Sequence, residues 1–127
     1  MLPNCGRVID LGIWSIDGST LEKYLNATST TSPIQTGTKL IPPVMLTAEI
    51  LRLLMNKLDL PSGTVHSGQE INAYNLVRPD QYVLGWAHAS KPSIKGEWQF
   101  VLIDFSLTDE NYRAVLMGKT TVMVPVN

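Results

Sequence analysis

The chain has 127 residues, a hydrophobic fraction of 44% and a formal net charge of −1. A chain of this length corresponds to a single domain, residues 1–127, which can bury a core without a disulfide or a structural metal. The near-neutral charge argues against a nucleic-acid partner or an anionic membrane partner. No apolar run approaches the roughly 20 residues that a membrane-spanning helix needs.

Cysteine usage and the first residues bear on the cellular compartment. Cys5 is the only cysteine, and no basic segment followed by an apolar stretch precedes or surrounds it. A single thiol excludes a disulfide framework and favours a reducing environment, so we expect a cytoplasmic protein. No set of His, Cys or acidic residues has metal-ligand spacing, so we expect neither a metal nor another cofactor.

The first element is a strand over residues 8–16. Its alternation predicts Ile9, Leu11 and Ile13 on one face. The dipeptide Asp17-Gly18 then predicts a turn.

A short helix follows the turn. Ser19-Thr20-Leu21-Glu22 has the sequence of a capping box, which predicts a helix that begins at Ser19. The stretch 27–35 is rich in Thr and Ser and contains Pro33, so we expect a loop there.

The next helix is predicted over residues 44–58. Its polar residues, Glu49, Arg52 and Asn56, form one narrow stripe, and nearly all the others are apolar. A helix that is apolar nearly all round is typically buried.

The rest of the chain reads as strands of about 8 to 15 residues. The expected strands cover residues 65–76, 82–89, 97–107 and 112–126, with a loop before Glu97 and a positive φ at Asn111. One buried helix with one long antiparallel sheet is an α+β layout, in which the sheet curves around the helix. Such a unit leaves an edge strand open, so we expect a dimer.

Two segments resemble a known family. Residues 24–35 resemble the motif of MaoC-like (R)-specific enoyl-CoA hydratases and dehydratases: Tyr, Ala, two variable residues, Ser-Gly-Asp, one variable residue, Asn-Pro-Ile-His. Tyr24, Pro33 and Ile34 match it, and Thr28 replaces its Ser. Residues 41–47, Ile-Pro-Pro-Val-Met-Leu-Thr, resemble the family's Ile-Ala-His-Gly-Met-Leu-Thr.

The second half adds to the resemblance. Residues 65–70, 77–80 and 107–110 are similar, in order and spacing, to a strand, a turn and a hairpin of the N-terminal dehydratase domain of this family. The resemblance covers nearly the whole chain and implies a hotdog fold, in which one long helix is wrapped by the sheet.

The catalytic positions of the family are altered in this chain. The resemblance implies an Asp, a His and a helix N-terminal Gly, and here these positions hold Thr30, Gln35 and Val44. Thr and Gln do not titrate at neutral pH, so they cannot supply general acid–base catalysis. By the same resemblance, Thr30, Gln35, Pro43, Val44 and His66 are the expected substrate-binding residues.

One other pair could supply acid–base chemistry. His66 and Glu70 are four residues apart on an expected strand, which predicts that both point to one face. The alternative is that His66 packs beside the helix and Glu70 faces solvent. His88, which shares its predicted face with Trp86, is expected to be a hydrogen-bonded structural histidine.

Two functions remain open from the sequence. One is a non-catalytic hotdog subunit that shapes an acyl-thioester tunnel for a catalytic hydratase or dehydratase, as a homodimer or a heterodimer. The other is an active acyl-CoA hydratase, dehydratase or thioesterase that uses His66 and Glu70. Either would bind an acyl-CoA or an acyl-carrier thioester.

Overall fold

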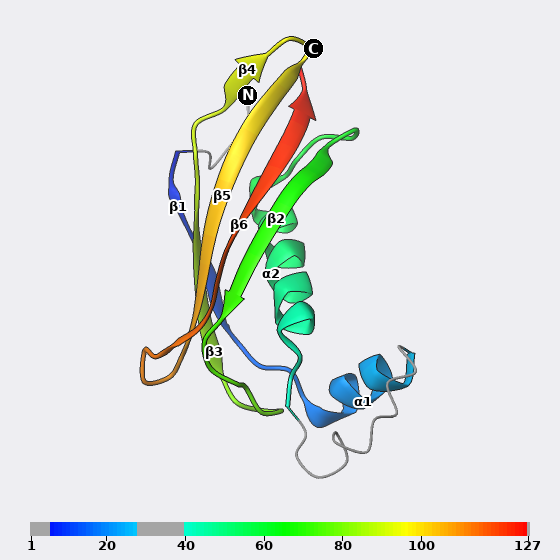
Figure 1. Cartoon of the computed structure of the whole chain (residues 1–127), viewed down its shortest axis with the longest axis vertical. Helices are drawn as coiled ribbons and strands as arrows, with labels where there is room; N and C mark the ends of the chain where they lie inside the picture. The colour runs from blue at the N-terminus through cyan, green and yellow to red at the C-terminus, as the bar shows by residue number, and fades with distance from the viewer. Residues whose placement is uncertain (1–5, 28–39, 127) are drawn as a thin grey trace.

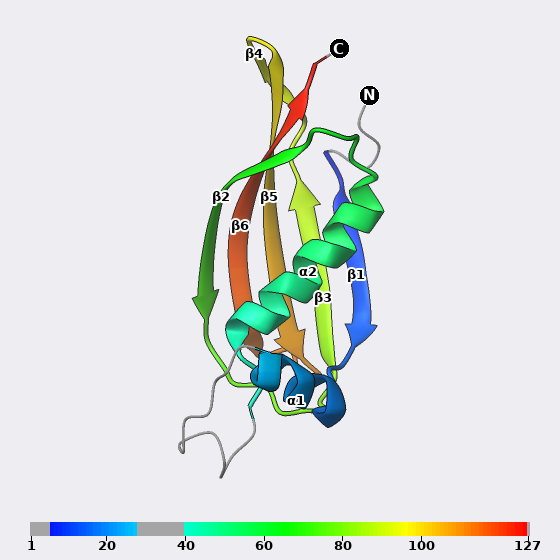
Figure 2. The same ribbon diagram turned by 90° about the vertical axis from the view of Figure 1, so that its right-hand side faces the viewer.

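The computed structural model describes residues 6–27 and 40–126. A six-stranded antiparallel sheet curves around the long helix α2 (Pro43–Leu58), and the short helix α1 (Gly18–Ala27) lies at one end of it (Figures 1 and 2). This is the predicted α+β layout. No helix in the described part of the chain is both long enough and apolar enough to cross a membrane.

The strands follow one antiparallel path. Their bounds are β1 Val8–Trp14, β2 Val65–Ala73, β3 Val83–Ala89, β4 Ser93–Lys95, β5 Trp98–Asp109 and β6 Ala114–Pro125. The order is β1-β3-β5-β6-β2, with β4 paired to β5 beside this path. β1 and β2 are therefore the edges. The loop expected before Glu97 was wrong in part, because β4 forms a hairpin with β5 there.

The core lies between α2 and the inner, concave face of the sheet. The buried stripe of α2 consists of Leu46, Thr47, Ile50, Leu54 and Leu58. The opposite side of the helix carries an ion pair between Arg52 and Glu49. The expected polar stripe is confirmed. The prediction that the rest of the helix is buried was wrong, because Leu51 and Leu53 are only half-buried.

A β-bulge changes which face the end of β1 presents. Asp10 pairs with Trp86 and Gly12 pairs with Gly85, so Leu11 is an extra residue on β1. Gly12 has φ +81°, and its N–H donates to Asp10 Oδ1 at 2.7 Å. The alternation shifts by one residue after the bulge. Ile13 is therefore 66% exposed, and the prediction that it shares a face with the buried Ile9 and Leu11 was wrong.

Helix α1 begins one residue earlier than predicted. The N–H of Thr20 donates to Asp17 Oδ1 at 2.6 Å, so Asp17 is the N-cap and the expected start at Ser19 was wrong. Hydrogen bonds from the side chain and backbone of Thr20 lower the pKa of Asp17. The cap orients Leu21, which is fully buried, toward the core.

The turn between β5 and β6 is held by one carboxylate. Asp109 Oδ1 accepts hydrogen bonds from the N–H of Asn111 at 2.8 Å and of Arg113 at 3.0 Å. The residue with positive φ is Tyr112, at 62°, so the prediction for Asn111 was wrong. The Asn111 N–H is bound within the turn, and the chain reverses one residue later.

Candidate functional site

The N-terminus of α2 is the place where the sequence predicts substrate binding. Pro42 has extended backbone angles, Pro43 begins the helix, and no side chain caps it. The N–H of Ile41 donates to the Val77 carbonyl at 2.7 Å, which holds the entering chain against the sheet. No acceptor for the Val44 N–H lies among the described residues. An unpaired N–H at a helix N-terminus suits a negatively polarised oxygen.

The expected binding residues are only partly covered by the structure. Pro43 and Val44 lie at the first turn of α2, as predicted, and the Val44 side chain is 60% exposed. Thr30 and Gln35, like Thr28, lie outside the described residues. Their contribution to the site remains a prediction from the sequence.

His66 lies at the opposite end of the sheet from Val44. The bridge from Ile41 to Val77 places the start of α2 beside the chain that leaves β2. His66 is the second residue of β2, and the strand from there to Ala73 spans roughly 23 Å. Within one chain, the structure therefore does not bring His66 together with Pro43 and Val44.

A second β-bulge separates the predicted acid–base pair. His66 pairs with Val122 and Gly68 with Thr121, which leaves Ser67 as the extra residue on β2. Residues opposite each other on neighbouring strands share a face. His66 is therefore on the inner side with the buried Val122.

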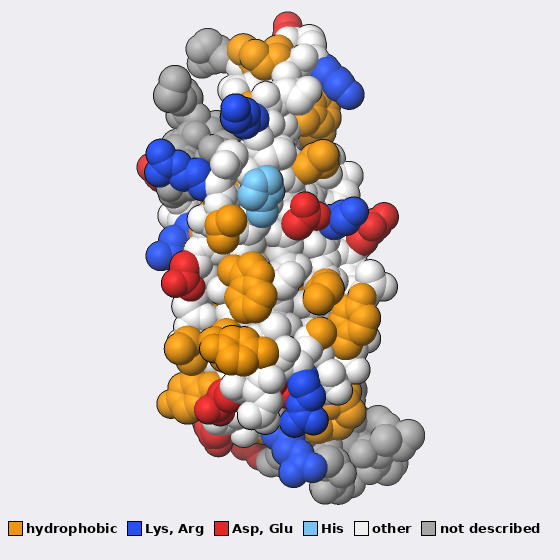
Figure 3. Space-filling view, turned by 90° about the vertical axis from the view of Figure 1, so that its left-hand side faces the viewer, with side chains coloured by type: hydrophobic (Ala, Val, Ile, Leu, Met, Phe, Trp, Pro, Cys, Tyr) orange, Lys and Arg blue, Asp and Glu red, His pale blue; other side chains and the backbone are white. Residues whose placement is uncertain are grey.

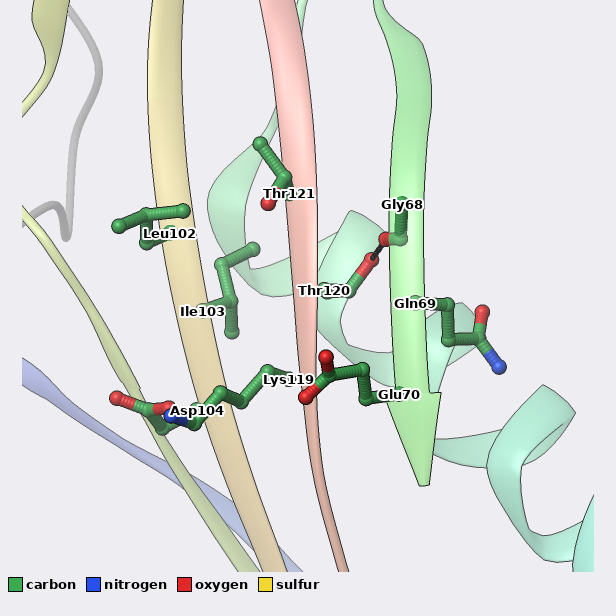
Figure 4. Close-up of a pocket in the computed structure, with 9 residues that line it drawn as sticks. All are labelled: Gly68, Gln69, Glu70, Leu102, Ile103, Asp104, Lys119, Thr120 and Thr121. Carbon is green, nitrogen blue, oxygen red and sulfur yellow. Dashed lines mark hydrogen bonds between the residues drawn. The ribbon is translucent and has the colours of Figure 1, made fainter.

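Glu70, in contrast, points to the other side of the sheet. It pairs with the exposed Lys119, and Figure 4 shows the two side chains on one side of the sheet. We call this side, opposite α2, the outer face. The prediction that His66 and Glu70 share a face was wrong, because the sequence period of two does not reveal a bulge.

The other histidine is also remote from α2. His88 is exposed on the outer face, opposite Asp104, and the part of the chain that the structure describes offers its ring no hydrogen bond. The expectation of a hydrogen-bonded structural histidine was therefore wrong. The sequence contains two histidines in all. Neither lies at the N-terminus of α2.

A cavity of about 390 Å³ opens on the outer face (Figure 4). It lies over β5, β6 and the bulged part of β2, where Gly68 has no side chain to fill it. Lys119 lies between two carboxylates of this cavity, Asp104 on β5 and Glu70 on β2. The sequence reasoning missed this cluster, because its members come together only through the pairing of three strands.

No group of three or more His, Cys, Asp or Glu side chains that could hold a metal ion occurs among residues 6–27 and 40–126. What the described site offers is an unpaired helix N–H beside apolar residues, which can bind a polarised oxygen but cannot move a proton.

No family model matches this chain, and no curated protein sequence does. Several solved structures are similar to it. One is the monoamine oxidase regulatory protein from Archaeoglobus, with a TM-score of 0.81 at 9% identity, covering 97% of this chain and 91% of that one.

Two further structures carry enzyme names. The HadBC (3R-hydroxyacyl-ACP dehydratase) complex from Mycobacterium tuberculosis has a TM-score of 0.76 at 11% identity, covering 94% and 96% of the two chains. The (R)-hydratase from A. caviae has a TM-score of 0.77 at 11% identity, covering 95% and 96%. The expected hotdog fold, shared with MaoC-like dehydratases and (R)-hydratases, is thereby confirmed.

Proposed function

We propose that this chain is a non-catalytic hotdog subunit, which shapes an acyl-thioester tunnel beside a catalytic hydratase or dehydratase subunit. One observation carries the proposal. The chain has two histidines, and the structure places both away from the N-terminus of α2, His66 at the far end of β2 and His88 on the outer face.

The chemistry of hydration explains why this matters. Adding water across the double bond of an enoyl thioester requires one group to take a proton from water and another to deliver a proton to carbon. At the start of α2 the chain presents Pro42, Pro43 and Val44, and the sequence has Thr30 and Gln35 at the family's Asp and His positions. These groups can bind and orient a ligand, but they cannot titrate at neutral pH.

The open edge supports a role beside another subunit. All but one of the residues of β2 are exposed, and β2 pairs only with β6. An exposed edge strand offers a row of unpaired backbone groups to another chain. A catalytic hotdog subunit that joins this edge supplies the acid–base pair. The HadBC structure, by its name, is a 3R-hydroxyacyl-ACP dehydratase complex.

An assay of the purified chain tests the proposal. Hydration of a short enoyl-CoA is followed by the loss of its ultraviolet absorbance, and binding of the same compound is measured by calorimetry. We expect binding without turnover. Turnover by the unmodified chain, abolished by His66→Ala, would show that the chain is an enzyme.

Restoring the motif provides a second arm. Thr30→Asp with Gln35→His puts titratable groups back, but Val44 still replaces the glycine at the oxyanion position. We expect little activity from the double variant, and measurable activity only after Val44→Gly is added. The variant Val44→Gly alone is the matched control and is expected to be inactive.

The second candidate function is an active hydratase, dehydratase or thioesterase that uses His66. The observation that favours it is the exposure of His66 on the edge strand, where a second subunit can complete a site. Glu70 cannot serve as its neighbour within one chain, because the two residues lie on opposite faces. Turnover lost in His66→Ala but retained in Glu70→Gln would support this candidate.

A further inference from the structure

The outer face of the sheet is free of covering elements within the described chain. Both helices lie on the other side of the sheet (Figures 1 and 2). Figure 3 shows the outer face, with hydrophobic side chains gathered beside a row of histidine, acidic and basic side chains. Three of its large side chains are notably exposed: Leu102 by 59%, Met117 by 41% and Trp86 by 39%.

One row of residues crosses four strands of this face in register. His88 pairs with Asp104, Asp104 with Lys119 and Lys119 with Glu70. We call these four residues the charged row. Neighbouring strands are about 4.8 Å apart, so the row is roughly 14 Å long. From His88 to Glu70, the row presents a hydrogen-bond donor, an anion, a cation and an anion. His88 counts as a donor because its ring carries an N–H in both of its protonation states.

The charged side chains of the row form no ion pair with the other described residues. The described residues form ion pairs between Arg52 and Glu49 and between Arg113 and Asp109, and neither involves the row. Lys119 reaches toward Asp104 in Figure 4 without forming an ion pair. The ammonium and both carboxylates therefore keep their capacity to bind another molecule.

We propose that the outer face binds a second copy of this chain, around a two-fold axis that runs parallel to the strands between β5 and β6. Such an axis places β5 of one copy over β6 of the other. Asp104 then faces Lys119 of the second copy, and this contact forms twice. Glu70 faces His88 of the second copy, also twice. Each residue of the charged row therefore faces a group in the second copy with which it can form an ion pair or a hydrogen bond.

The neighbouring rows are complementary in size under the same axis. Leu102 is opposite Thr121 in the sheet register, and Ser106 is opposite Met117. The axis therefore sets Leu102 over Thr121 and Met117 over Ser106 of the second copy. Large side chains meet smaller ones, which lets two faces interdigitate instead of colliding. Packed sheets cross at about 30°, so these central residues form the closest contacts.

The proposal is independent of the function proposed above, because the charged row lies on the side of the sheet away from α2. It also differs from pairing at the β2 edge, which leaves the outer face uncovered. The two contacts use different surfaces, so loss of the outer-face contact leaves pairing at the β2 edge possible.

Charge exchange tests the contact. The mass of the full-length chain is measured by sedimentation at micromolar concentration for the unmodified protein and for Lys119→Glu, Asp104→Lys and the double exchange Asp104→Lys with Lys119→Asp. Each single variant sets like charges face to face twice, so we expect its dissociation constant to rise about tenfold or more and its mass to fall by half. The double exchange restores opposite charges and is expected to restore the mass.

Arg78→Glu is the matched control, since it reverses an exposed charge on the loop before β3 and is expected to leave the mass unchanged. Circular dichroism confirms that each variant is folded. A row that only stabilises its own sheet through cross-strand pairs would change the melting temperature and not the mass. That result overturns the proposal, as does an unmodified chain that is monomeric, or a folded double exchange that stays dissociated.

Discussion

The ring of Phe105 lies directly over Gly118, its opposite residue on β6. A Cβ atom at position 118 would lie 2.7 Å from Phe105 Cε1 and 2.6 Å from the carbonyl oxygen of Glu70. The glycine therefore allows a fully buried aromatic ring to pack flat against the sheet between β5 and β2. Backbone on one side and a buried ring on the other leave a methyl group no room.

Gly118→Ala is accordingly expected to lower the free energy of unfolding by about 1–3 kcal/mol, the usual cost of overpacking a core. Denaturant titration measures it. Gly68→Ala is the matched control, because a Cβ there meets nothing within 4 Å, and its change should stay within about 0.5 kcal/mol. Equal effects for the two variants would mean that the close contact at Gly118 relaxes without cost.

Two leucines of helix α2 have the same side chain but differ in burial, so the cost of truncating each can be compared. Leu54 is fully buried against the sheet, whereas Leu51, three residues earlier, is half-buried. Leu54→Ala is expected to cost about 2–5 kcal/mol, and Leu51→Ala distinctly less. Urea titration of both variants checks which of them loses more free energy of unfolding. A loss below about 1 kcal/mol for Leu54→Ala would contradict the central position of the helix.

Acid stability should depend on the turn between β5 and β6. The backbone N–H of Arg113 is the main cause that lowers the pKa of Asp109, with a further hydrogen bond from Asn111. A carboxyl group whose pKa is lowered by folding stabilises the folded state above its unfolded pKa of about 3.9. That stabilisation is lost as the pH falls through the lowered value.

Asp109→Asn should therefore reduce the dependence of stability on pH in this acidic range. The test compares the urea midpoints of the unmodified protein and of Asp109→Asn between about pH 2 and about pH 6. The difference between the two midpoints should become smaller toward low pH. Asp80→Asn, on the exposed turn before β3, serves as control. A gap that stays constant across the range would show that the ionised carboxylate is not what holds the turn.

The β2 edge is the surface on which pairing with another hotdog chain is predicted. The N–H of Tyr74 donates to Val115 on β6, so by alternation the N–H of Gln69 points to the open edge. Proline at an edge position removes only the outward donor and leaves the pairing with β6 intact. Gln69→Pro should abolish edge pairing, and Gln69→Ala should not. Sedimentation of each variant mixed with a catalytic hotdog subunit measures this pairing, and a complex that forms equally with both variants would contradict the prediction.

The sequence alone determined the layout of this protein. One amphipathic segment with apolar residues at helical spacing, followed by long stretches rich in β-branched and aromatic residues, permits few arrangements other than a curved sheet around a helix. That Thr30 and Gln35 do not titrate at neutral pH is likewise evident from the sequence, because it depends on residue type and not on geometry.

Tertiary structure decided which side chains meet. The bulges at Leu11 and Ser67 each move the following residues to the other face, so Ile13 turns outward and Glu70 is separated from His66. Nothing in a period-two pattern indicates where an extra residue is inserted. The row that contains Asp104 and Lys119 is invisible for the same reason: its members are far apart in the chain, and only the strand register places them side by side.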